Sequence, residues 1–185
     1  GFGRRAMAVN PAEAKAYMIY QVGALQAFCD SYGVTLQHMK LHGAFYNTAC
    51  VTPALADAVL DGLQAVNPNI AAMVLSGSYI AKEAQRRGTP VIQEVFADRG
   101  YTDEGTWVPR TEPGAFIKDP QEALERVLMM FTEGKVVTNT GNTIDIVADS
   151  VCVHGDNPEA IAFTNYIREG LTKAGVTVAN FQNRK

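Results

Sequence analysis

Apolar residues recur along the chain with two periods, one typical of amphipathic helices and one typical of short buried strands. Positions three or four residues apart form three helical stripes: Met18, Val22, Leu25, Cys29 and Tyr32; Leu55, Val59, Leu63 and Val66; and Leu124, Val127, Leu128 and Phe131. Apolar and β-branched segments between the helices predict strands at 34–41, 70–75, 91–97 and 150–154. Since helices and strands alternate, we expect an α/β layer or barrel of parallel strands joined by right-handed crossovers.

Prolines and glycines mark the ends of the predicted helices. A side chain that can cap a helix precedes a proline at Asn10, Thr52, Asp119 and Asn157. A glycine, which closes a helix well in the left-handed conformation, follows a helical pattern at Gly33, Gly88, Gly134 and Gly175. A β-branched run follows each of these glycines, which is typical of a helix that ends shortly before a strand.

The composition is that of an ordinary globular protein, and we expect residues 1–185 to form a single domain. The net charge of −3 and the lack of a basic block argue against nucleic acid or an anionic membrane as a partner. No apolar run approaches the roughly 20 residues of a membrane helix, and no signal peptide is recognisable. The three cysteines are scattered without a CxxC pair, which is typical of a reducing compartment. We therefore expect a cytoplasmic protein.

The first predicted strand carries basic side chains on one face. His38, Lys40 and His42 point away from the side of Met39 and Leu41, because successive side chains alternate across a strand. A buried polar group without a partner costs about 1–3 kcal/mol, so this face requires a polar cavity. A substrate carboxylate or phosphate would satisfy Lys40. His42 is a candidate active-site residue, with a core imidazole bonded to the backbone as the alternative, and His38 lies deeper, in a supporting role.

Polar residues cluster at the ends of three predicted strands. The clusters are His42-Gly43 with Tyr46-Asn47, the run from Glu94 to Tyr101, and His154-Gly155-Asp156. Ligands of α/β folds bind at the carboxyl ends of parallel strands, so we expect Lys40, Glu94 and His154 to open into one shared pocket. The irregular connection 98–119 is long, and a loop of that length is more often functional than idle.

The acidic strand end allows several roles. Glu94 is unusual in a strand with apolar neighbours, and it is either a general base or the counter-ion of Lys40. Asp98 and Arg99 are candidates for binding or catalysis, and a local salt bridge between them is the alternative.

Four further candidates lie at or beyond the other strand ends. Tyr101 and Arg110 belong to the long connection, where a solvated surface position is the alternative to substrate binding. His154 and Asp156 precede a predicted helix whose free N–H groups suit an anion. Helix capping by Asp156 or Asn157 is the alternative there, and both readings are compatible.

Several common motifs are absent. Neither GxxxxGK[ST] nor GxGxxG occurs, so ATP, if used, is not bound by a P-loop in this chain. Neither HxH nor HExxH occurs, and metal ligation would have to rest on His42 and His154. Cys29 and Cys152 lie among apolar residues and are predicted to be inert packing, while Cys50 has no evident base beside it.

Four motifs in register resemble the LamB/YcsF family, and the likeness covers nearly the whole chain. They are Lys40-Leu41-His42-Gly43-Ala44-Phe45-Tyr46-Asn47, Glu94-Val95-Phe96-Ala97-Asp98-Arg99-Gly100-Tyr101, Val108-Pro109-Arg110 and Val151-Cys152-Val153-His154-Gly155-Asp156. Leu41 stands where the family usually has proline. Family members also carry an amino-terminal stretch, with an Asp-Leu-Asn-x-Asp-x-Gly-Glu segment, that this sequence does not contain. The resemblance implies an irregular seven-stranded (β/α) barrel of the glycoside hydrolase/deacetylase type, here a partial domain without its first βα units.

The resemblance also implies an activity. The family supplies one component of the bacterial ATP-dependent 5-oxoprolinase, which hydrolyses 5-oxo-L-proline to L-glutamate as ATP is converted to ADP and phosphate. Subunits B and C of that 5-oxoprolinase are the implied partners, and ATP would be shared with them. A divalent metal in the full-length chain and assembly of several copies stay open.

Residue chemistry suggests roles at the matched positions. Glu94 or Asp98 would orient or deprotonate water, and Lys40, His42 and Arg99 would hold the substrate carboxylate and stabilise negative charge. The residues expected to bind the substrate are Tyr46, Asn47, Tyr101, Arg110, His154 and Asp156.

Two other functions stay open from the sequence. One is a metal-dependent, deacetylase-like amidohydrolase that needs no ATP. The other is a non-catalytic module that binds 5-oxoproline and hands it to other subunits.

Overall fold

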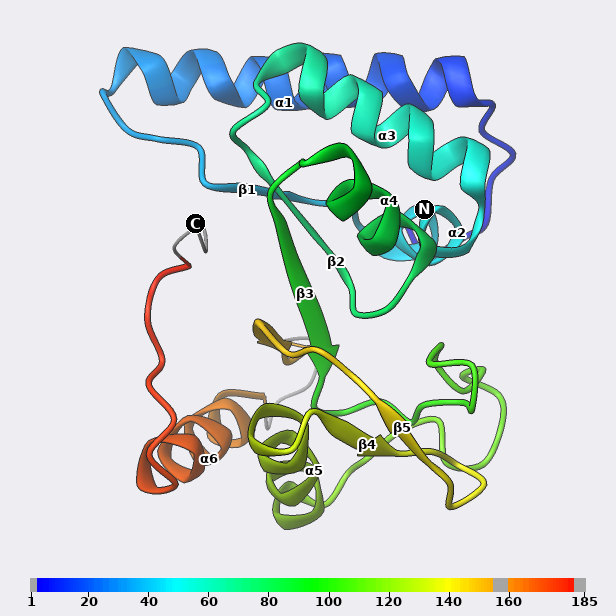
Figure 1. Ribbon diagram of the computed structural model, residues 1–185, viewed down its shortest axis with the longest axis vertical. Helices are drawn as coiled ribbons and strands as arrows, with labels where there is room; N and C mark the ends of the chain where they lie inside the picture. Colours follow the sequence, from blue (N-terminus) through cyan, green and yellow to red (C-terminus); the bar gives the residue numbers. More distant parts are fainter. Residues whose placement is uncertain (1–2, 155–159, 182–185) are drawn as a thin grey trace. The chain divides into compact units, whose positions relative to one another are not determined.

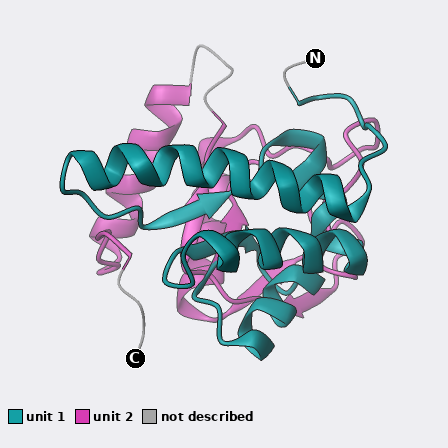
Figure 2. Ribbon diagram, turned by 90° about the horizontal axis from the view of Figure 1, so that it is seen from above, with its two compact units in different colours: residues 1–92, 183–185 teal, residues 93–182 magenta. Residues whose placement is uncertain are grey.

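Residues 3–154 and 160–181 are described by a computed structural model of the protein, in which the chain forms two compact units. Unit 1 comprises Gly1–Ile92 with Asn183–Lys185, and unit 2 comprises Gln93–Gln182 (Figure 2). Helices and parallel strands occur in both units. The single domain expected over residues 1–185 stays a prediction.

The described part of unit 1 contains four helices and a parallel strand pair (Figure 1). In chain order they are α1 (Pro11–Ser31), β1 (His38–Lys40), α2 (Gly43–Val51), α3 (Pro53–Val66), β2 (Ala71–Leu75) and α4 (Tyr79–Arg87). β1 runs parallel to β2, with His38 opposite Ala71 and Lys40 opposite Met73. The carboxyl end of β1 leads directly into the turn before α2, where the sequence places its first polar cluster.

The core of unit 1 lies between α1 and α3. The apolar stripe of α3 is buried as predicted at Leu55, Val59 and Leu63. α1 comes close to α3 at Gly62, where an added Cβ atom would lie 2.6 Å from the Cβ atom of Met18. Any larger residue at position 62 would therefore push the two helices apart.

The stripe predicted for α1 is only partly right. Met18 and Val22 are buried, but 51% of Leu25 and 79% of Tyr32 are exposed. α1 carries apolar residues around its whole circumference, so spacing alone could not identify the face that packs against α3.

Several helix ends follow the predicted signals, but Thr52, predicted to cap the helix that begins at residue 53, makes no side-chain capping bond. Asn10 and Glu13 form a capping box at the start of α1, with the side chain of Asn10 accepting the N–H of Glu13. Asp119 caps the helix that begins at residue 120, and Gly88 closes α4 in the left-handed conformation with φ 72°. The predicted cap Asn157 lies outside the described residues.

The described part of unit 2 contains a parallel strand pair, an antiparallel hairpin and two helices. Its elements are β3 (Val91–Phe96, which begins at the end of unit 1), α5 (Pro120–Thr132), β4 (Lys135–Val137), β5 (Thr143–Asp145), β6 (Ser150–Cys152) and α6 (Ala160–Lys173). β3 runs parallel to β6, with Glu94 opposite Ser150 and Phe96 opposite Cys152. The β4–β5 hairpin was not predicted, because β5 is only three residues long and two of them are polar and exposed.

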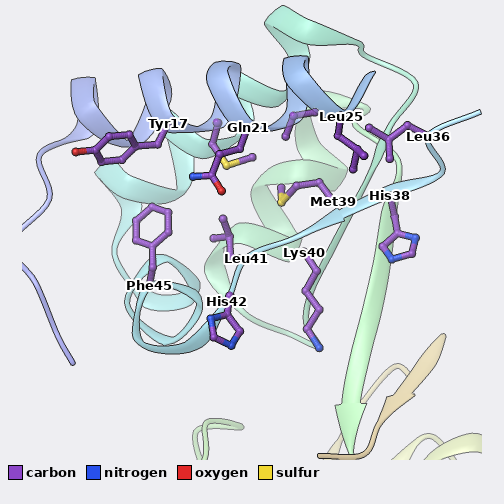
Figure 3. A pocket seen from close by; sticks show the side chains of 12 residues that line it. Tyr17, Gln21, Leu25, Leu36, His38, Met39, Lys40, Leu41, His42 and Phe45 are labelled. Atoms are coloured by element: carbon purple, nitrogen blue, oxygen red, sulfur yellow. The ribbon is translucent and has the colours of Figure 1, made fainter. Parts of the chain in front are cut away.

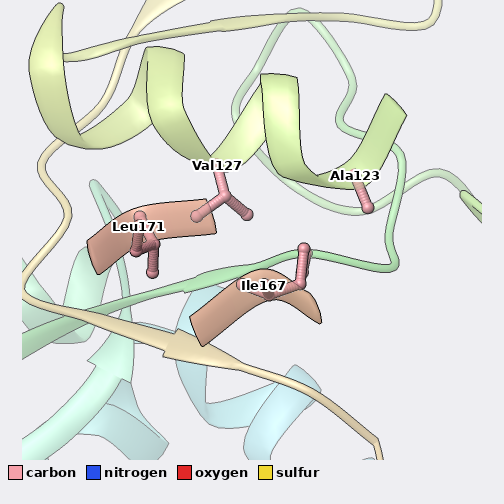
Figure 4. Close-up of a cluster of buried hydrophobic side chains, with 5 residues drawn as sticks. Ala123, Val127, Ile167 and Leu171 are labelled. Carbon is pink, nitrogen blue, oxygen red and sulfur yellow. The ribbon is translucent and has the colours of Figure 1, made fainter. Parts of the chain in front are cut away.

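α5 and α6 pack against each other through small and branched side chains (Figure 4). Val127 of α5 lies in one buried cluster with Ile167 and Leu171 of α6, as its predicted stripe requires. Gly170 permits this approach, since an added Cβ atom would lie 2.3 Å from a methyl carbon of Leu124.

An α/β fold with parallel strands is thus confirmed. β2 and β3 match their predicted ranges closely, whereas β1 and β6 are shorter than the predicted 34–41 and 150–154. The seven-stranded barrel and its missing first units stay predictions. Within the described ranges, no single helix is long and apolar enough to cross a membrane; α2 and α3 meet that test together but are bent by 111°.

Candidate functional site

The alternation predicted for the first strand is present in unit 1. His38, Lys40 and His42 project from β1 and its end on the side away from α1, while Met39 and Leu41 point towards that helix (Figure 3). Met39 and Leu41 are buried, His38 is partly buried, and Lys40 and His42 are exposed. The strand therefore presents a row of three basic side chains, which we call the basic row.

A cavity of about 440 Å³ lies beside this strand. It is lined by Tyr17, Met18, Gln21, Val22 and Leu25 of α1, by residues 36 and 38–42, and by Phe45 of α2. Most of these side chains are apolar, and the cavity lies on the α1 side of the strand, so the polar cavity predicted for the basic row stays a prediction. Because Lys40 and His42 are exposed, water can hydrate them and no buried polar partner is required.

Tyr46 and Asn47 belong to the first predicted polar cluster. They lie in α2, beyond the turn at His42 and Gly43. Tyr46 is buried, and its ring lies below Lys40 with the Nζ atom 5.7 Å from the ring centre. This is a cation–π contact, which favours a fixed direction for the Lys40 side chain. Asn47 is exposed.

The turn that carries His42 depends on Gly43. Its φ angle is 62°, and the next N–H, of Ala44, donates to the carbonyl oxygen of Gly3 over 2.7 Å. A Cβ atom on Gly43 would lie 2.2 Å from that same oxygen, and one on Gly3 would lie 2.7 Å from Nδ1 of His42. The segment at Gly3 thus packs directly against the His42 turn.

Replacing Gly43 with alanine is therefore expected to destabilise unit 1 more than replacing Gly33. Gly33 has a similar φ angle of 66°, but its Cβ position is open space, so alanine there should cost only the left-handed strain of about 1–2 kcal/mol. At Gly43 the backbone clash also breaks the bond between Ala44 and Gly3, which adds about 1 kcal/mol or more. Urea denaturation of both variants measures the difference, and equal losses would contradict this account of the turn.

The carboxylates on α3 and α4 are already paired with an arginine. Arg87 donates to Glu83, Asp57 and Asp61, each over 2.6 or 2.7 Å. Hydrogen bonds from Arg86 and Arg87 lower the pKa of Glu83 to about 2. These acids therefore belong to an ion-pair network that joins α3 to α4.

In unit 2 the structure brings together two predicted site residues that are 56 positions apart. Nδ1 of His154 lies 2.6 Å from Oδ2 of Asp98, and both side chains are largely buried. An ionised carboxylate only accepts hydrogen bonds, so Nδ1 carries the hydrogen and Nε2 is left as the basic atom of the ring. Their meeting follows from the parallel pairing of β3 with β6, since each residue lies two positions beyond a paired residue, Phe96 or Cys152.

The alternative of a local salt bridge between Asp98 and Arg99 was wrong. Arg99 is buried, and its Nε and Nη2 atoms donate to the carbonyl oxygens of Ala115 and Val108 over 3.0 and 2.8 Å. Burial lowers the pKa of Arg99. These bonds join distant parts of the long connection 98–119 to each other.

The two other candidates in the long connection, Tyr101 and Arg110, differ in their burial. Tyr101 is fully buried, so its predicted alternative of a solvated position was wrong. Its hydroxyl accepts the N–H of Phe96 over 3.0 Å, and burial raises its pKa well above the ordinary value. Arg110 is exposed, with its guanidinium 5.2 Å from the ring centre of Phe116.

The structure does not test the roles predicted for Glu94 and Asp156. Glu94 is buried on β3, and its role as base or counter-ion stays a prediction. Asp156 lies outside the described residues. The shared pocket expected for Lys40, Glu94 and His154 also stays a prediction, because Lys40 belongs to unit 1 and the other two to unit 2.

The described residues do not fit a metal centre. Among them, no group of three or more His, Cys, Asp or Glu side chains comes together. Asp98 and His154 are one such pair, but a metal site needs further ligands. We assign no chemical step to a metal.

Sequence reasoning missed the aromatic side chains beside His154. Phe96 lies against the imidazole, and Trp107 lies against Phe96. A signal was present, because Trp107 is the only tryptophan of the chain and falls in the long connection that follows the acidic strand end.

Known proteins resemble this chain over nearly its full length. Residues 1–185 match the LamB/YcsF family. The chain is similar to the 5-oxoprolinase A subunit of Fusobacterium nucleatum subsp. nucleatum, with 58% identity over 178 residues, 96% of this chain and 69% of that protein. It is similar to the 5-oxoprolinase A subunit of Brevibacillus brevis, with 45% identity over 97% of this chain and 70% of that protein. The crystal structure of a lactam utilization protein from Thermus thermophilus has a TM-score of 0.89 and 41% identity, covering 98% of this chain and 72% of that one.

Proposed function

This chain belongs to the LamB/YcsF family, and from this premise we propose that it acts as the A component of a 5-oxoprolinase. The reaction proposed is hydrolysis of 5-oxo-L-proline to L-glutamate, coupled to hydrolysis of ATP to ADP and phosphate. The names of the relatives speak for a multisubunit enzyme, and subunits B and C are the proposed partners.

The observation that carries a catalytic role is the His154–Asp98 pair. Opening of a lactam requires that water add to the carbonyl carbon, that the carbon–nitrogen bond break, and that the nitrogen leave with a proton. With Nδ1 held by Asp98, Nε2 of His154 is placed to take a proton from the attacking water and to return it to the ring nitrogen. Asp98 stabilises the imidazolium that exists between these two transfers.

The basic row gives the proposal its binding component. 5-Oxoproline carries a carboxylate, and a lysine that is directed by a ring beneath it suits such a group. We propose that Lys40 and His42 bind this carboxylate. Their exposure lets a substrate reach them without movement of the core.

ATP enters the proposal as a second substrate. A lactam is a stable amide, and transfer of the γ-phosphoryl group of ATP to its oxygen, with ADP leaving, would make the carbonyl carbon easier for water to attack. Breaking the carbon–nitrogen bond would then leave an acyl phosphate, and a second water would hydrolyse it to glutamate and phosphate. The sequence offers no P-loop, so we propose that ATP is bound together with the partner subunits.

The test measures glutamate formation from 5-oxoproline by the full-length protein, alone and with its partner subunits, together with calorimetric titration of 5-oxoproline. The proposal expects binding to this protein and ATP-dependent turnover by the complex. Turnover that persists without ATP in protein containing stoichiometric zinc would favour the deacetylase-like alternative. Binding, with turnover that is unaffected by changes at His154, would favour a non-catalytic binding module.

A further inference from the structure

The ring of Phe96 stacks on the imidazole of His154, and Trp107 in turn packs against Phe96. The ring of Phe96 lies 5.8 Å from that of His154, centre to centre, with an angle of 29° between the planes. Trp107 meets Phe96 at 5.1 Å and 88°, which is an edge-to-face contact. Both are arrangements that aromatic rings prefer. We call Phe96 and Trp107 the aromatic support.

The hydrogen bond to Asp98 alone does not fix the imidazole. One bond restrains the distance from Nδ1 to Oδ2, but χ1 and χ2 of His154 can still change together and tilt the ring while this distance is kept. A flat contact on one ring face removes this freedom, because turning the imidazole would drive it into Phe96. The direction of Nε2 is then defined by two contacts of different kinds.

The aromatic support is itself anchored within unit 2. Phe96 is 6% exposed, and its N–H donates to the hydroxyl of the fully buried Tyr101. Tyr101 also pairs with Trp107 in an antiparallel bridge, and Thr102 donates its N–H to the carbonyl of Thr106 over 2.8 Å. The buried Tyr101 therefore contacts both supporting residues and fixes their positions relative to each other.

We propose that Phe96 and Trp107 are positioning residues that fix the plane of the His154 ring and thereby the direction of Nε2. This inference rests on the proposed function, in which Nε2 moves the proton. Phe96 acts on His154 directly, and Trp107 acts through Phe96.

The experiment compares Trp107→Leu, Trp107→Phe and the wild type in the complete 5-oxoprolinase complex. Leucine removes the edge that holds Phe96, so kcat should fall about 10- to 100-fold, with a smaller change in KM, because a misdirected base mainly affects the chemical step. Phenylalanine keeps a ring edge and should restore most of kcat. Phe131→Leu, an aromatic loss in a partly buried part of α5, controls for lowered stability alone.

A second readout does not depend on activity. A ring stacked on His154 shifts the ring-proton signals of that histidine in the NMR spectrum, and the chain has only three histidines to assign. Trp107→Leu should reduce this shift and Trp107→Phe should retain it. Unchanged kcat and an unchanged His154 signal in Trp107→Leu, or an equal kcat loss in Phe131→Leu, would overturn the positioning role. A wild-type complex that forms no glutamate would instead refute the proposed function, while the NMR comparison would still report on the ring.

Discussion

Replacing Asp98 with asparagine is expected to lower kcat for 5-oxoproline hydrolysis by about 10²–10⁴-fold. Asparagine keeps the size of the side chain but removes its charge, so it no longer stabilises a protonated His154. Its amide group can also donate to Nδ1, which would turn the imidazole into the wrong tautomer and leave Nε2 carrying the hydrogen. Steady-state glutamate formation by the full complex measures the change.

Asp145→Asn provides the matched control for this variant. Asp145 is exposed on β5, in the same unit, and should keep wild-type kcat after the same chemical change. Thermal unfolding of both variants separates a lost proton-transfer step from a lost fold. A kcat for Asp98→Asn that equals the kcat for Asp145→Asn would remove the pair from the mechanism.

Replacing Lys40 with methionine is expected to weaken the binding of 5-oxoproline by about 10- to 100-fold, since a charge-assisted hydrogen bond contributes about 1.5–3 kcal/mol. Methionine keeps the length and the apolar stem that lies above Tyr46, so the change is confined to the ammonium group. Calorimetric titration with 5-oxoproline gives the dissociation constant directly, and added salt should weaken wild-type binding.

Lys82→Met on α4 is the corresponding control, because Lys82 is also exposed in unit 1 and lies outside the basic row. Its dissociation constant should match that of the wild type. If Lys40→Met raises only the KM for ATP and leaves the affinity for 5-oxoproline unchanged, the basic row binds a phosphate group and the carboxylate role is wrong.

The sequence predicted the kind and order of the main elements because local signals determine them. Capping by Asn10 and Asp119, closure by Gly88 and the stripe of α3 all act within a few residues of the feature that they specify. The errors arose where the structure of a segment depends on a partner that is distant in the sequence. The face of α1 depends on where Gly62 allows a close approach, and β5 exists because it pairs with β4.

The same distinction applies to the site. The polar strand ends were recognisable, and the alternation of the basic row was correct, because a strand fixes the side of each residue. The pairing of Asp98 with His154 was not predicted, since it depends on β6 being the neighbour of β3. Tyr101 and Arg99 were expected near substrate, but their bonds to the backbone of unit 2 place them in its interior. Polar side chains in a long connection can serve to hold that connection together.

The central claim is that His154, held by Asp98, acts on the lactam, and NMR of histidine labelled with ¹⁵N in the full-length protein tests it most directly. Titration with 5-oxoproline should move the Nε2 signal of His154 until the site is saturated, at a concentration that matches the calorimetric dissociation constant. The signal of His38, which belongs to the basic row but is not one of the two residues proposed to bind the carboxylate, should move less than that of His154. A His154 signal that stays in place while 5-oxoproline saturates a protein active with its partners would contradict the account.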